Sequence, residues 1–155
     1  MTESFLEKVK LSLPVGLWIE NCMSSGLDAA TIISSIHNQE WTALLAKVAD
    51  PQMDMVDRLQ IATDMNDPWE QAIIEGYRFK FIHIGGVKRL LHFRFQLQEH
   101  RDYTQTGNKL SGLVLHSDMI SSIEEKIGIQ WEIVTDPQTL SNQFALQIRL
   151  KNESC

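Results

Sequence analysis

The sequence predicts an α+β fold, in which an N-terminal array of short helices packs on a C-terminal, mostly antiparallel sheet of four to five strands with one inserted helix. Two observations carry this prediction. Apolar residues recur every three or four positions up to Gly76, whereas most segments after Gly76 alternate apolar and polar residues. The chain also has 155 residues, close to the usual size of one domain. We therefore expect a single domain over residues 1–155, with a helical half at 1–76 and a sheet-forming half at 77–151.

The helical half begins with three predicted helices. Thr2 is expected to cap a first helix that ends near Leu13. Pro14 suits the first turn of a second helix, because its missing N–H costs nothing there, and Gly26 is a typical residue after a helix end. Asp28 is expected to cap the third helix.

Residues 29–49 carry apolar stripes that fit either one bent helix or two short ones. The segments Leu27–His37 and Gln39–Ala49 have the arrangement of a helix-turn-helix pair, but Lys47 is the only lysine or arginine in the second segment. A recognition helix lies against phosphates and needs more positive charge. We therefore expect these helices to form a packed layer.

Two Asp-Pro pairs predict two further helix starts. In both Asp50-Pro51 and Asp67-Pro68, an acidic residue that can cap a helix precedes a proline suited to the first helical position. Gly76 is expected to end the second of these helices.

The sheet-forming half begins with a predicted strand at Tyr77–Ile84. The next pair, Gly85-Gly86, fits either a tight hairpin turn or the start of a helix. The hairpin register leaves neither face of the two strands cleanly apolar, so we favour a helix over Val87–Phe93. Residues 91–97 also alternate as a strand does, which keeps the strand as the alternative there.

The clearest β-α-β pattern follows. Leu110–Leu115 is predicted as a strand, and Ser117 is expected to cap a helix that Gly128 ends. Residues 129–133 and 144–150 alternate as two further strands, which we expect to pair antiparallel across a turn at Asp136-Pro137.

The charge of the chain is distributed unevenly around its formal net value of −6. Residues 1–77 hold 4 Lys/Arg against 12 Asp/Glu, a net of −8, and residues 102–155 hold 4 against 7, a net of −3. Residues 78–101, called here the basic segment, hold 6 against 1, a net of +5. Such a segment either steers a partner or pairs with acidic groups of the same chain.

The basic segment is the predicted contact surface. We expect a small regulatory or adaptor protein that acts by protein–protein interaction through this segment, since tryptophan and arginine are enriched at interface centres and the chain has four tryptophans. Nucleic acid is the alternative partner, because the segment interleaves cations with aromatic residues. The six cations are Arg78, Lys80, Lys88, Arg89, Arg94 and Arg101.

A third hypothesis is an anion-binding or nucleotide-binding site at Gly85-Gly86. A strand that ends in two glycines and opens a helix directs backbone N–H groups at an anion, and Lys88 and Arg89 add positive charge. The segment matches neither the phosphate-loop nor the dinucleotide-binding pattern, so a turn is the competing interpretation.

Patterns typical of catalysis are missing from the sequence. The five histidines do not show the spacing of zinc ligands, and no nucleophile turn of the Gly-x-Ser-x-Gly type occurs. We therefore expect a binding protein rather than an enzyme, with no cofactor and no metal.

Two cysteines, Cys22 and Cys155, form no disulfide framework, and Cys22 is expected to be a small core residue. The first ten residues lack a basic region followed by an apolar core, so we expect no signal peptide. No apolar run is long enough to span a bilayer. These features predict a cytoplasmic protein that does not contact membranes.

Overall fold

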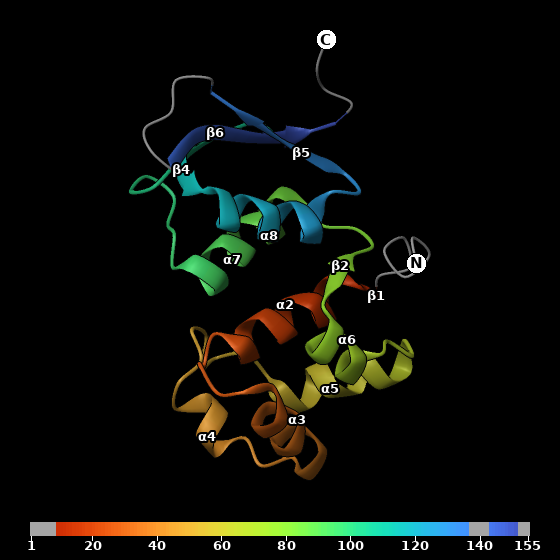
Figure 1. The fold of residues 1–155 in the computed structure, drawn as a ribbon. Coiled ribbons are helices and arrows are strands. Elements are labelled where there is room, and N and C mark those ends of the chain that lie inside the picture. Colours follow the sequence, from red (N-terminus) through yellow and green to blue (C-terminus); the bar gives the residue numbers. More distant parts are fainter. Residues whose placement is uncertain (1–8, 137–142, 152–155) are drawn as a thin grey trace.

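The computed structural model describes residues 9–136 and 143–151, and it confirms the predicted fold class (Figure 1). The helical half contains β1 (Val9–Leu11), α2 (Leu13–Met23), α3 (Ala29–Asn38), α4 (Thr42–Leu45), α5 (Met55–Asp64) and α6 (Trp69–Glu75). The second half contains β2 (Tyr77–Phe79), α7 (Ile84–Phe95), β3 (Thr104–Thr106), β4 (Lys109–His116), α8 (Ser117–Ile127), β5 (Trp131–Thr135) and β6 (Gln143–Leu150).

The elements form layers, which Figure 1 shows from the side. A four-stranded sheet lies at one end, and α2 to α6 lie at the other. Helix α8 packs on β4 and β5, and α7 packs on α2, so these two helices lie between the sheet and the N-terminal array. The N-terminal helices therefore reach the sheet through α7 and α8.

The sheet has the strand order β3-β4-β6-β5, and all its pairs are antiparallel. β6 lies between β4 and β5, the two strands that α8 connects. Leu110, Ile148 and Ile133 share one row of the register and face the core. The predicted antiparallel pairing of the last two strands is confirmed, although the turn between them lies partly outside the described residues.

The core continues from the helical half into the sheet. Its largest fully buried side chains include Trp18 of α2, Tyr77 and Phe79 of β2, and Phe93 of α7. Helix α2 lies so close to β2 that a Cβ at Gly16 would be 2.2 Å from the Phe79 ring. Only glycine allows this contact without moving the ring.

The first predicted helix is wrong over Val9–Leu11, where the chain forms β1; residues 1–8 lie outside the described part. β1 pairs in parallel with β2, with Val9 opposite Tyr77 and Leu11 opposite Phe79. The strand predicted over Tyr77–Ile84 is also too long, since β2 ends at Phe79.

After β2, side chains rather than a neighbouring strand form hydrogen bonds with the backbone. The N–H of Ile82 donates to Oε1 of Gln130, and the carbonyl of Ile82 accepts from Nε1 of Trp131. These bonds satisfy the backbone of a buried residue without a ladder, so the chain leaves the strand conformation. Phe81, which follows β2, is 55% exposed.

The helix starts were only partly predicted. Asp28 caps α3 as expected, accepting from the N–H of Thr31 at 2.8 Å. Asp50-Pro51 does not start a helix, because α5 begins at Met55 behind Asp54. Asp67 caps no helix either: its Oδ2 accepts from Oγ and N of Ser12, joining the start of α6 to α2.

Two helix boundaries differ from the predictions. α2 ends at Met23 rather than Gly26, and Ser117 is the first residue of α8 rather than its cap. α4 has only four residues, too few for a recognition helix, so the helix-turn-helix arrangement is absent from this part of the chain. The favoured helix at Val87–Phe93 is confirmed and extends over Ile84–Phe95.

Candidate functional site

The cations of the basic segment pair with carboxylates of the same chain. Five of the six form ion pairs within the described residues. Their N–O distances are 3.5 Å for Lys80–Asp67, 2.9 Å for Lys88–Glu99, 3.2 Å for Arg89–Asp50, 2.8 Å for Arg94–Glu20 and 2.9 Å for Arg101–Asp102. Nε of the sixth, Arg78, is buried and makes no hydrogen bond in this part of the chain.

The Arg94 pair is the most buried of the five. Glu20 is 2% exposed and accepts from Nε of Arg94 at 2.9 Å and from its terminal nitrogen at 2.8 Å. The hydroxyl of Tyr77 also donates to Glu20, and Nζ of Lys126 lies 4.6 Å from the centre of the Tyr77 ring. The cluster joins α2, β2, α7 and α8, so it connects the N-terminal helices to the two helices that lie between them and the sheet.

Burial changes the proton affinities in this cluster. Burial, reinforced by the neighbouring Glu20 carboxylate, raises the pKa of Tyr77 well above its ordinary value. Burial lowers the pKa of Lys126, against the opposing effect of its partner Glu125. The tyrosine therefore stays neutral and donates a hydrogen bond to Glu20, which is the arrangement of a structural network.

The two glycines of the predicted anion site have structural roles. Nδ1 of His83 accepts from the N–H of Gly86 at 2.9 Å and so caps α7. A Cβ at Gly86 would lie 2.8 Å from Ile82 and 2.9 Å from Leu13, and one at Gly85 would lie 3.3 Å from the His83 ring. The first glycine leaves room for the capping ring, and the second allows α7 to approach its neighbours.

The two cations predicted for that site separate. Lys88 turns toward Glu99 and toward Gln105, whose Oε1 lies 2.7 Å from Nζ. Arg89 lines a small hollow with Arg58 and His83. Sequence reasoning missed Arg58, because nothing in its local pattern indicates that α5 brings it beside the start of α7.

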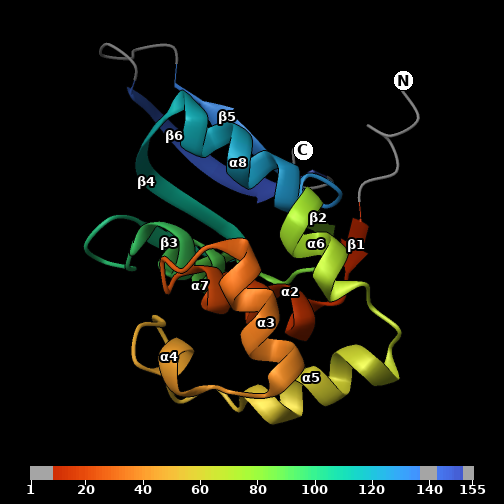
Figure 2. The same cartoon turned by 60° about the horizontal axis from the view of Figure 1, so that its bottom comes forward.

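An apolar groove lies between α3 and α6, which run side by side in Figure 2. This α3–α6 groove has a volume of about 650 Å³. Ile74 of α6 lines it and is 63% exposed, the highest value among the large apolar side chains of the described residues. Its lining residues are Ala29, Ala30, Ile33, Ser34, His37, Asn38 and Ile74.

The surroundings of this groove carry acidic charge. Helices α3 and α6 contain no lysine or arginine, whereas Glu70 and Glu75 of α6 are exposed. Nε2 of His37 lies 2.7 Å from Oε1 of Glu70, and its ring packs 5.1 Å from the ring of Trp69. One wall of the groove is therefore held by packing. Sequence reasoning missed Ile74, because it lies beside Ile73 and only the fold decides which of the two is buried.

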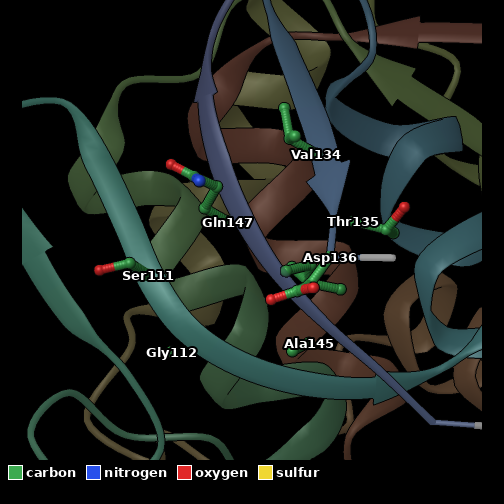
Figure 3. Close-up of a pocket in the computed structure, with 8 residues that line it drawn as sticks. Ser111, Gly112, Val134, Thr135, Asp136, Ala145 and Gln147 are labelled. Carbon is green, nitrogen blue, oxygen red and sulfur yellow. The ribbon is translucent and has the colours of Figure 1, made fainter. Parts of the chain in front are cut away.

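A second hollow, of about 500 Å³, lies on the sheet. Figure 3 shows Ser111, Gln147 and Val134 on three neighbouring strands, in the register row next to the one that faces the core. Its lining residues include no aromatic ring and no cation, so they lack the groups that stack on bases and bind phosphates.

The described residues offer no evident reactive group. Cys22 is fully buried, as predicted, and burial raises the pKa of its thiol to about 12. Over residues 9–136 and 143–151, no three His, Cys, Asp or Glu side chains gather in a way that would hold a metal ion. In the same ranges, no helix has the length and apolar character needed to cross a bilayer.

With this geometry established, the chain was compared with known proteins. No protein-family model, no curated protein sequence and no solved structure matches it.

Proposed function

We propose that the protein is a regulatory or adaptor module that binds another protein through the α3–α6 groove. The observation that carries this proposal is an open apolar groove of about 650 Å³ with Ile74 63% exposed beside Ile33. Apolar grooves on a protein surface often mark binding sites. The buried free thiol of Cys22 fits a reducing compartment, and we place the module in the cytoplasm.

The partner that fits this groove is an amphipathic helix with basic flanks. Grooves between two helices accept the apolar stripe of a third helix, spaced at i, i+3, i+4 and i+7. Glu70 bonds to His37 of the groove lining, and neither α3 nor α6 contains a lysine or arginine. Lysines or arginines beside the apolar stripe of the partner would therefore meet opposite charge.

The basic segment is a weaker candidate for the contact surface. Five of its cations already face carboxylates of this chain, so a partner must compete with internal pairs. The same pairing reduces the positive potential available to nucleic acid, whose binding rests on free cations that neutralise phosphates.

The proposal is tested with a fluorescent amphipathic peptide of about 18 residues, long enough for five helical turns. The peptide carries leucines at i, i+3, i+4 and i+7 and lysines beside them. Fluorescence anisotropy compares the wild type with Ile74→Gln, and Val56→Gln is the matched control, because Val56 is 54% exposed on α5 outside the groove. A version of the peptide with glutamates in place of its lysines tests the charge requirement.

We expect Ile74→Gln to weaken peptide binding about tenfold, as the loss of one buried apolar side chain implies. Val56→Gln should bind as the wild type does, and the glutamate peptide should bind more weakly than the lysine peptide. Equal binding by the two variants would show that the groove is not the contact surface. Equal binding of the two peptides would remove the basic helix as the partner.

A further inference from the structure

We infer that the hollow between α2, α5 and α7 binds a small organic anion, a function separate from the α3–α6 groove. The hollow measures about 160 Å³, roughly the volume that five water molecules occupy in the liquid. Three basic side chains line it, one from α5, one from the residue before α7 and one from the second turn of α7. These are Arg58, His83 and Arg89.

The hydrogen bond that caps α7 fixes the proton of His83. Nδ1 of this histidine accepts from the N–H of Gly86, so a neutral ring carries its proton on Nε2. Nε2 is then a hydrogen-bond donor. His83, which lines the hollow, therefore has a hydrogen-bond donor on Nε2 even when it carries no charge.

The two arginines keep most of their donors free for a ligand. A guanidinium has five N–H groups. Arg58 spends one bond on Asp57 at 2.8 Å, and Arg89 spends one on Asp50 at 3.2 Å while its Cζ lies 5.2 Å from the centre of the Phe93 ring. Each guanidinium therefore has N–H groups beyond the one that its ion pair uses, and an oxyanion would share the arginine with its carboxylate.

Asp50 is itself held in place, which orients Arg89. Its backbone N–H donates to Oδ1 of Asn21 at 2.9 Å, its carbonyl accepts from Nδ2 of Asn21 at 2.9 Å, and its Oδ1 accepts from the N–H of Gln52 at 3.0 Å. Asn21 is fully buried in α2. A cation positioned by an anchored partner loses less freedom when it binds a ligand.

The remaining lining residues indicate that the part of the ligand away from its charge is apolar. They are apolar and come from the start of α2 and the segment before α5: Leu13, Pro14, Leu17 and Met53. An ion without carbon would leave this surface in water, whereas a short aliphatic tail would cover it. The hollow therefore fits a carboxylate or a phosphate monoester with a few carbon atoms.

This site differs from a phosphate loop at Gly85-Gly86. The N–H of Gly86 is already bonded to His83, and Val87 N–H bonds to the carbonyl of His83, so these backbone donors are not available. The anion is bound by side chains.

The test is a titration of the isotope-labelled protein, followed by the amide resonances of Gly85, Gly86 and Arg89. The probes are acetate, butyrate and inorganic phosphate at low ionic strength, each up to about 20 mM, where a ligand of millimolar affinity approaches saturation. Arg58→Gln and Arg89→Gln test the site. Arg101→Gln is the control, since it removes the same charge from an exposed residue outside the hollow.

We expect saturable shifts at these amides, tighter binding of butyrate than of acetate, and a loss of about tenfold in affinity in each of the two site variants. The control should bind as the wild type does. Binding of phosphate alone would assign the ligand to the phosphate class. No saturable shift with any probe, or equal weakening by Arg101→Gln, would overturn the inference, and neither result bears on the α3–α6 groove.

Discussion

The basic segment is conspicuous in the sequence but has few unpaired cations in the structure, whereas the α3–α6 groove is inconspicuous in the sequence but exposes an apolar surface in the structure. The basic segment has the most conspicuous composition of the chain, with six cations against one carboxylate. In the fold, five of those cations face carboxylates. The groove comes from segments with few charges and ordinary helical spacing, yet it leaves Ile74 in water.

The difference shows that a run of like charges need not be a binding surface. Glu20, Asp50 and Asp67 lie far from their partners along the chain, so these three pairs form only when the chain folds. Internal pairing produces this pattern, in which one segment has an excess of positive charge and the rest of the chain has an excess of negative charge. We conclude that the basic segment mainly stabilises the fold.

The largest expected effect comes from breaking the buried pair. Arg94→Met leaves the carboxylate of Glu20 buried without its cation, which typically costs about 3–5 kcal/mol. Arg101→Met removes an exposed pair and should cost less than about 1 kcal/mol. Urea unfolding measures both. Equal small losses would mean that Arg94 does not stabilise the fold and would return it to the candidates for a contact surface.

The next effect concerns the two glycines. Gly86→Ala pushes a methyl group against Ile82 and Leu13, and such overpacking lowers the free energy of unfolding by about 1–3 kcal/mol. The better helix propensity of alanine raises it by about 1 kcal/mol. We expect a net loss of up to about 2 kcal/mol in the free energy of unfolding. Gly85→Ala, which meets only the His83 ring, should change it by less than about 0.5 kcal/mol. The reverse order would contradict the packing role of Gly86.

Charge reversal tests whether Lys88 and Arg89 are free. In the double variant Lys88→Glu with Arg89→Glu, the new carboxylates face Glu99 and Asp50, so stability should fall by about 1 kcal/mol. The loss should shrink in high salt, because salt screens exposed charges. Thermal unfolding at two salt concentrations provides the measurement. A variant as stable as the wild type would show that the two pairs do not form in solution.

The smallest effect is a change in pH dependence. Burial, with Glu99 and Asp102 nearby, raises the pKa of Tyr103 to about 12. A folded-state pKa above the unfolded value of about 10 gives a stabilisation that is complete below pH 10 and is lost as the pH rises toward 12. Tyr103→Phe should therefore lose less stability than the wild type between pH 10 and 12. If the wild type and Tyr103→Phe lost equal stability between pH 10 and 12, the placement of the Tyr103 ring beside Glu99 and Asp102 would be contradicted.

Much of the fold was predictable because local signals and tertiary packing agree. The helix over Ser117–Ile127 has a clean apolar stripe, and the strands on either side alternate, so α8, β4 and β5 appeared near their observed places. The cap at Asp28 was predictable because it depends on only three residues.

Other elements follow from contacts that no local pattern reveals. β1 exists because it pairs with β2, which lies far along the chain. Asp67 looks like a cap in the sequence but bonds to Ser12, and β2 stops where Gln130 and Trp131 satisfy the backbone of Ile82. The same limit applies to the sites, since both the groove and the anion hollow combine distant segments.

The most direct test of the contrast is site-specific photo-crosslinking in cells that make the protein. A photoreactive residue replaces Ser34 at the groove, and in separate variants it replaces Lys80, which is 50% exposed, or Arg101, which is 58% exposed. We predict that position 34 links to one protein through a basic amphipathic helix, identified by mass spectrometry, and that positions 80 and 101 do not. Links from 80 or 101 to a common partner, with none from 34, would contradict the assignment and restore the basic segment as the contact surface.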